Sequence, residues 1–123
     1  MTSKVLAVML AMSACLVLTQ NASSIREFEA TVSDILGNPD KFNQMEVKVQ
    51  GQVVQITKTT TELGSIWINF FLVDANTGDK IAVEYNGPLN LQESALVTVH
   101  GDFYKRPTQT GFTPVIRAVT VLQ

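Results

Sequence analysis

The feature that most constrains the fold is an alternation of apolar and polar side chains that recurs along the chain after residue 44. Alternation over such lengths is typical of strands with one buried face. The segments are Met45–Thr57, Ser65–Asp74, Lys80–Tyr85, Ala95–Tyr104 and Val115–Leu122. In the first of them one side carries Val47, Val49, Gly51 and Val53, and in the fourth one side carries Val97, Val99, Gly101 and Phe103. Five strands of this size, the first long and bent, predict a small all-β barrel, closed or partly closed.

The first of these strands carries a break in its pattern. Val53 and Val54 are adjacent apolar residues, so the alternation changes phase there. A bulge near Gly51 would account for the change and would bend the strand, as a small barrel requires. Two strands separated by a break are the alternative interpretation.

A short helix is expected ahead of the strands. Thr31–Gln44 combines apolar residues at helical spacing with a polar start, and Thr31 or Ser33 can act as its N-cap. The run Gly37–Pro39 is typical of a helix end. We therefore expect one or two helical turns followed by a loop.

The first 24 residues differ in character from the rest. A short start with one positive charge, Met1–Lys4, precedes the apolar run Val5–Leu18, and small polar residues follow in Thr19–Ser24. This order is typical of a secretory signal, and the run is shorter than the roughly 20 apolar residues of a membrane-spanning helix. The sequence predicts a signal peptide at residues 1–24, removed after Ser24, a single domain at 25–123, and a periplasmic or secreted protein.

Cys15, the only cysteine, leaves an alternative open. It follows Met-Ser-Ala, which loosely resembles a bacterial lipidation box, but apolar residues continue through Leu18, where a lipidated protein would begin its polar mature part. We interpret Cys15 as part of the signal core, so the membrane becomes a partner only if Cys15 is lipidated or the signal is retained. No cysteine would remain after cleavage, and the fold would depend on its core without a disulfide.

The charge of the mature part limits its partners. From Ile25 onward, eight Lys and Arg stand against eleven Asp and Glu, a net charge of −3. A nucleic-acid binder normally has a basic excess, because neutralisation of phosphates supplies much of its affinity. The charge and the export signal both argue against a nucleic-acid partner.

Four short motifs carry a family resemblance. They are V-x-V-x-G-x-V at Val47–Val53, F-x-L-x-D at Phe70–Asp74, I-x-V-x-Y-x-G at Ile81–Gly87 and V-x-V-x-G-x-F at Val97–Phe103. They resemble the strands of bacterial OB-fold domains, and N-P-D-K-F-N at Asn38–Asn43 resembles the leading segment of anticodon-binding-like OB domains. The resemblance covers Leu36 to Leu122 and implies a five-stranded OB-fold barrel with a short N-terminal helix.

Among exported members of this group, the sequence most resembles the periplasmic haem chaperone of cytochrome c maturation. In that family, the same order of strands is followed by a histidine tail that binds haem covalently. This sequence has Leu122–Gln123 where the tail should begin. The resemblance implies haem handling in c-type cytochrome assembly as an alternative function, without the haem-binding tail.

Candidate catalytic residues are few. The predicted mature part contains one histidine and no cysteine, and it lacks the common metalloprotease, phosphate-binding and nucleophile-elbow motifs. The single imidazole, His100, is predicted to point outward from its strand, where it could ligate haem iron or sense pH, although a solvated surface histidine is the preferred interpretation. We expect a protein that is not an enzyme and has no metal site or cofactor, haem being the cofactor to consider.

The best candidate for a binding site is the outer face of the second strand. Ile66, Ile68, Phe70 and Leu72 share the face assigned to the core, which leaves Trp67, Asn69 and Phe71 outside. OB folds bind ligands on the outer surface of the second and third strands, between the loops after the first and fourth strands. Those loops are predicted at residues 58–64 and 105–114. The basic residues Lys58, Lys80, Lys105 and Arg106 are predicted to form a rim around this face.

A second interpretation of the aromatic pair remains open: the N-terminal helix or the leading segment could cover Trp67 and Phe71 as a second small core. The preferred function is an exported, non-catalytic OB-fold binding module that acts through contact with a protein partner or small ligand in the cell envelope. The alternatives are haem handling and single-stranded nucleic-acid binding.

Overall fold

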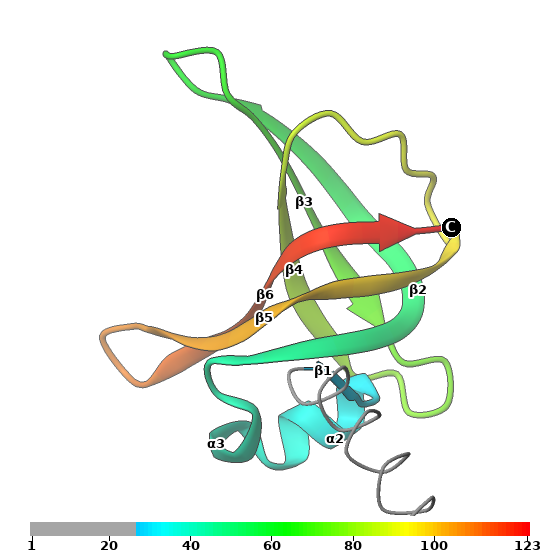
Figure 1. Ribbon diagram of the computed structural model, residues 1–123, viewed down its shortest axis with the longest axis vertical. Helices are drawn as coiled ribbons and strands as arrows, with labels where there is room; N and C mark the ends of the chain where they lie inside the picture. The colour runs from blue at the N-terminus through cyan, green and yellow to red at the C-terminus, as the bar shows by residue number, and fades with distance from the viewer. Residues whose placement is uncertain (1–26) are drawn as a thin grey trace, which may run out of the picture.

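The computed structural model describes residues 27–123, which form a closed five-stranded barrel with two short helices at one end (Figure 1). The barrel strands are β2 (Met45–Thr60), β3 (Ile66–Val73), β4 (Lys80–Asn86), β5 (Leu96–Pro107) and β6 (Phe112–Leu122). They follow the order β2-β3-β4-β6-β5, and β5 pairs back onto β2 to close the barrel. The β4–β6 pairing is parallel and the other barrel pairings are antiparallel. The predicted all-β barrel of five strands is confirmed.

The long first strand closes the barrel by pairing with two neighbours in turn. Along β2, residues up to Gln52 pair with β5, and residues from Gln52 onward pair with β3. Gly51 lies at this change, where a Cβ atom would approach the Val73 carbonyl oxygen to 2.7 Å. Glycine is therefore required there by the close approach of the two backbones.

The bulge predicted near Gly51 lies further along the strand. The β2–β3 register shifts between Val54 and Thr57, and Gln55 has a φ of 57°. The backbone N–H groups of Gln55 and Ile56 donate to the Glu93 carboxylate at 3.3 and 3.0 Å. The connector before β5 thus supplies acceptors for the N–H groups that the bulge leaves unpaired, a long-range contact with no local signal.

The inward faces of the strands form one core, as the alternation predicts. Its members from the strands are Val47, Val49, Val53, Ile68, Phe70, Leu72, Ile81, Val83, Val97, Val99, Phe103, Ile116 and Ala118. Gly101 also faces inward, and a Cβ atom there would lie 2.3 Å from the Arg117 carbonyl oxygen. The faces predicted for the first, second and fourth barrel strands are confirmed.

Two short helices close one end of the barrel: α2 (Val32–Gly37) and α3 (Pro39–Phe42) (Figure 1). Thr31 caps α2 through a reciprocal pair of 3.0 Å hydrogen bonds with Asp34, the capping box. Val32 and Ile35 are fully buried in the barrel core. Helix α2 ends at Gly37, within the run expected to stop it, and Pro39 occupies the first position of the additional helix α3, where its missing N–H costs nothing.

Two features extend the fold beyond the prediction. A three-residue strand, β1 (Glu27–Glu29), pairs in parallel with β2. The arms of the β5–β6 hairpin continue to Pro107 and from Phe112, so the loop predicted at residues 105–114 is mostly strand, and the hairpin projects from the barrel (Figure 1). Both features depend on pairing partners that a local pattern does not identify.

The helices of the described residues are all too short and too polar to cross a membrane. The predicted signal peptide, its cleavage after Ser24 and Cys15 lie outside the residues that the structure describes.

Candidate ligand-binding face

The outer side of β3 carries two half-buried aromatic rings with an amide between them. Phe70 is only 2% exposed and points into the barrel, so its neighbours on the strand point outward. Trp67, Asn69 and Phe71 are all half-buried on this outer side. We call these three residues the aromatic face.

The position of α2 bears on the alternative in which the N-terminal helix covers Trp67 and Phe71. Val32 and Ile35 of α2 are buried in the barrel core, and Ser33 contacts the β3–β4 turn. These side chains of α2 therefore pack at the end of the barrel. Trp67 and Phe71 lie on the wall of the barrel, where β3 pairs with β2 and β4.

A groove of about 410 Å³ runs beside the aromatic face. It is lined by Gln55 and Thr57 of β2, Asn69, Phe70 and Phe71 of β3, and Ala82, Val83 and Glu84 of β4. Asn69 lies opposite Glu84 and Phe71 lies opposite Ala82 in the β3–β4 pairing. The groove therefore places amide, hydroxyl and carboxylate groups beside an aromatic ring, which suits a ligand with both ring-shaped and polar parts.

The four basic residues of the predicted rim divide between two sides of the barrel. Lys80 lies on the outer side with its Nζ 4.8 Å from the centre of the Phe71 ring. Arg106 is also on the outer side, with Nη2 2.7 Å from Glu84 Oε1. Lys58 and Lys105 point elsewhere: Lys58 is paired with inward-facing Ile68. The continuous rim of four is not formed.

Lys105 illustrates why the rim divides. Its Nζ lies 2.5 Å from Asp40 Oδ1 of α3 and 4.5 Å from the centre of the Phe112 ring. Because Lys105 and Arg106 are consecutive residues of one strand, their side chains leave opposite faces of β5. Once β5 is known to extend to Pro107, this separation follows from the period of the strand.

Sequence reasoning missed a polar cluster that continues the aromatic face across β4, β6 and β5. Its centre is Tyr104, whose Oη accepts hydrogen bonds from the Nη2 atoms of Arg106 and Arg117, the latter at 3.3 Å. Tyr104 Oη also lies 3.5 Å from Glu84 Oε1. We call Glu84, Tyr104, Arg106 and Arg117 the tyrosine cluster. The hydrogen bond to Glu84, with a further one to Tyr104, raises the pKa of Arg106 above its already high ordinary value.

No short sequence signal could have located the tyrosine cluster. Glu84 meets Arg117 only through the parallel pairing of β4 with β6, and Tyr104 meets Val115 through the β5–β6 pairing. Glu84 and Arg117 are therefore 33 residues apart in the sequence. A hypothesis that β4 and β6 pair in parallel would have been needed first.

His100 lies outside the aromatic face. It is paired with Lys48 and lies beside a shallow hollow of about 260 Å³ that includes Glu46 and Val119. Among residues 27–123, no group of three or more His, Cys, Asp or Glu side chains is arranged to hold a metal ion.

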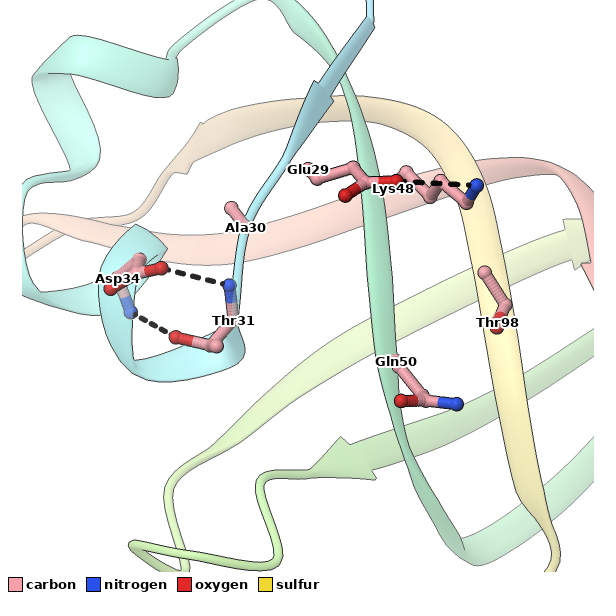
Figure 2. Close-up of a pocket in the computed structure, with 7 residues that line it drawn as sticks. All are labelled: Glu29, Ala30, Thr31, Asp34, Lys48, Gln50 and Thr98. Atoms are coloured by element: carbon pink, nitrogen blue, oxygen red, sulfur yellow. Dashed lines mark hydrogen bonds and ion pairs between the residues drawn. The ribbon is translucent and has the colours of Figure 1, made fainter.

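A second pocket of about 410 Å³ opens between β1, the start of α2 and the outer sides of β2 and β5 (Figure 2). Its lining is polar apart from Ala30: Glu29, Thr31, Asp34, Lys48, Gln50 and Thr98. Most of its charged groups already have partners, since Lys48 lies 3.4 Å from Glu29 and Asp34 bonds with Thr31 (Figure 2). It contains no aromatic ring, so the aromatic face is the stronger candidate.

Comparison with known proteins identifies the fold. No protein-family model matches this chain, and no curated protein matches it in sequence. The OB domain of a Thermoplasma acidophilum protein is similar in structure, with a TM-score of 0.52 and 17% identity over 79% of this chain and 86% of that one. A Klebsiella pneumoniae subsp. pneumoniae lipoprotein, described as a candidate nucleic acid-binding protein, has a TM-score of 0.55 and 19% identity over 77% of this chain and 92% of that one. At these identities the likeness is one of fold, and the chain has the OB fold.

Proposed function

We propose that this chain is an exported, non-catalytic binding module that holds its ligand across the aromatic face. The observation that carries the proposal is the pair of half-buried rings, Trp67 and Phe71, beside a polar groove on β3 and β4. These strands correspond to the second and third strands of an OB barrel, whose outer surface is the usual ligand surface of the fold. The rings are four residues apart, about 13 Å along an extended strand, so one ligand contacting both must be extended.

The preferred ligand is a segment of a protein partner or a small ligand of the cell envelope. Aromatic rings pack against planar or ring-shaped groups, while Asn69 and Gln55 can both donate and accept hydrogen bonds. The net charge of −3 after Ile25 supports a ligand that is not strongly anionic along its whole length. Haem remains a ligand to test, because of the family resemblance.

Single-stranded nucleic acid is the second candidate. Stacking of bases on exposed rings and contact of phosphates with cations are the general requirements of such binding. Lys80, Arg106 and Arg117 lie on the same side of the barrel as the aromatic face. The similar Klebsiella pneumoniae lipoprotein is described as a candidate nucleic acid-binding protein, which adds support.

Export is supported by the character of the first 24 residues. The similar Klebsiella pneumoniae protein is described as a lipoprotein, which adds support. We therefore propose that the binding module acts in the periplasm or outside the cell.

The sequence provides its own reporter for this proposal, because Trp67 is the only tryptophan. The purified protein is titrated with a short oligothymidylate, a neutral oligosaccharide, an extended peptide and haemin, and tryptophan emission is followed. We expect a saturable change in emission with at least one of them. Phe71→Ala should lower the affinity for that ligand by about tenfold, because roughly 1–3 kcal/mol of stacking on one ring is lost.

The matched control is Val119→Ala, which removes an exposed apolar side chain from β6 outside the aromatic face. This variant should bind as the wild-type protein does. A ligand that binds with no change in Trp67 emission and with equal affinity for Phe71→Ala would show that the aromatic face is not the site.

A further inference from the structure

The tyrosine cluster holds two guanidinium groups against one aromatic ring. The Cζ atoms of Arg106 and Arg117 lie 5.4 and 5.3 Å from the centre of the Tyr104 ring. Both side chains also donate to Tyr104 Oη. Stacking and hydrogen bonding to the same residue fix the two forks beside each other, so less rotamer freedom remains to be lost when a ligand binds.

The charges of the cluster do not balance. Among the described residues, Glu84 is the one carboxylate that forms an ion pair with either arginine, and its Oε1 lies 2.7 Å from Arg106 Nη2. Arg117 is exposed and has no ion pair with a carboxylate of residues 27–123. Within the cluster, two permanent positive charges therefore face the single negative charge of Glu84. Asp102 lies opposite Arg117 in the β5–β6 pairing but forms no ion pair with it.

We propose that Arg106 and Arg117, held by Tyr104, form a binding site for an oxyanion group of the ligand, a phosphate or a carboxylate. Guanidinium groups present paired N–H donors that match the two oxygens of such groups. Glu84 lines the groove beside Asn69 and Phe71, so the oxyanion site adjoins the aromatic face. The inference rests on the proposed function for the remainder of the ligand, and it assigns the chemistry of one end of it.

Glu84 then has a defined role as the internal counter-ion of this site. Its carboxylate occupies an N–H donor of Arg106 Nη2 that a ligand oxyanion would otherwise use, and its charge repels that oxyanion. The side chain of Glu84 is 19% exposed, against 42% for Arg106, so its charge is only partly screened by solvent. Glu84 therefore weakens the binding of simple anions and favours ligands that also contact the aromatic face.

The test uses anions that carry no ring. The full chain, labelled with nitrogen-15, is titrated at low ionic strength with inorganic pyrophosphate and, separately, with citrate, and the Nε–Hε signals of Arg106 and Arg117 are followed by NMR. We expect saturable shifts of both signals. Glu84→Gln should bind the same anion tighter by about fivefold or more, because a negative charge that repels the anion from a few ångströms away is removed. The anion that binds tighter identifies phosphate or carboxylate as the natural group.

Glu46→Gln is the matched control, since it removes the same charge from an exposed position on β2. It should change anion affinity by less than about twofold, because exposed charges at a distance are screened. Arg117→Ala, a change at an exposed residue, should abolish the shift of Arg106 while leaving the melting temperature unchanged.

Equal tightening by Glu84→Gln and Glu46→Gln would overturn the proposal, because the effect would then be one of net charge. Absence of any shift at Arg117 in both wild type and Glu84→Gln would also overturn it. Neither result bears on Trp67, since pyrophosphate and citrate have no ring to stack. Failure of the oxyanion site and failure of the aromatic face are therefore distinguishable.

Discussion

Phe70 and Phe71 are chemically identical neighbours whose surroundings differ completely. Phe70 is 2% exposed and packs in the barrel core, whereas Phe71 is half-buried on the outer side, with Lys80 over its ring. The difference follows from the period of two along β3, which places consecutive side chains on opposite faces. This pair therefore tests both the phase of the strand and the assignment of the aromatic face.

Phe70→Ala should lower the free energy of unfolding by about 3–5 kcal/mol, the usual cost of removing a buried phenylalanine and leaving a cavity. Phe71→Ala should cost no more than about 1 kcal/mol, because the ring keeps part of its surface in water in the folded state. Urea denaturation of the two variants measures the difference. Equal losses would place both rings in the core and remove the aromatic face as a candidate site.

Among the elements, α2 is joined to the turn between β3 and β4 by one residue, Ser33. Ser33 Oγ lies 3.0 Å from carboxylate oxygens of both Asp74 and Asp79, and 2.6 Å from Thr77 Oγ1. Asp74 also accepts a bond from the Asn76 N–H at 2.9 Å. The N–H of Asn76 first, and the Ser33 hydroxyl second, lower the pKa of Asp74 from its ordinary value of 3.8.

This lowered pKa predicts a specific dependence of stability on pH. Because the folded state favours the ionised form of Asp74, its contribution is complete above the unfolded pKa near 3.8 and is lost as pH falls through the lower folded pKa. Asp74→Asn should therefore be less stable than wild type at pH 7, and the difference in melting temperature should shrink on acidification below about pH 4.

Ser33→Ala is the companion variant for this measurement. It removes one of the hydrogen bonds that favour ionised Asp74 and leaves the carboxylate in place. Its deficit should shrink over the same range of pH, to a smaller extent. Differences from wild type that stay constant between pH 7 and pH 2 would show that the turn is held by shape rather than by the ionised carboxylate.

The elements also show what the sequence could and could not predict. The inward faces of β2, β3 and β5 follow from local alternation, and the N-cap at Thr31 follows from residue type. The bulge at Gln55 was predicted at the wrong place. The N–H group of Gln55 donates to the carboxylate of Glu93, which is 38 residues away in the sequence and leaves no local signal. The tyrosine cluster was missed for the same reason, since strand pairing rather than spacing brings its members together.

In the molecule as a whole, the residues of the core lie well away from the first residues of the sequence. The buried apolar residues of the described part run from Val32 to Ala118, and the first described strand begins at Glu27. The sequence before Ile25 is cationic at its start and then apolar, while the part after it is acidic. The chain thus divides into a segment with the character of a targeting signal and a barrel whose described contacts begin beyond it.

This division leads to a prediction about the native protein. Cleavage after Ser24 would leave Ala22 and Ser24 at the two positions that a signal peptidase requires to be small, and it would spare β1 and every residue of the core. We expect mass spectrometry of protein isolated from the native envelope or medium to find a chain that starts at Ile25, and that chain to melt at the same temperature as the full-length protein. A native chain that starts at Met1 would contradict export by cleavage. A chain that starts at a lipid-modified Cys15 would instead place the barrel on a membrane surface.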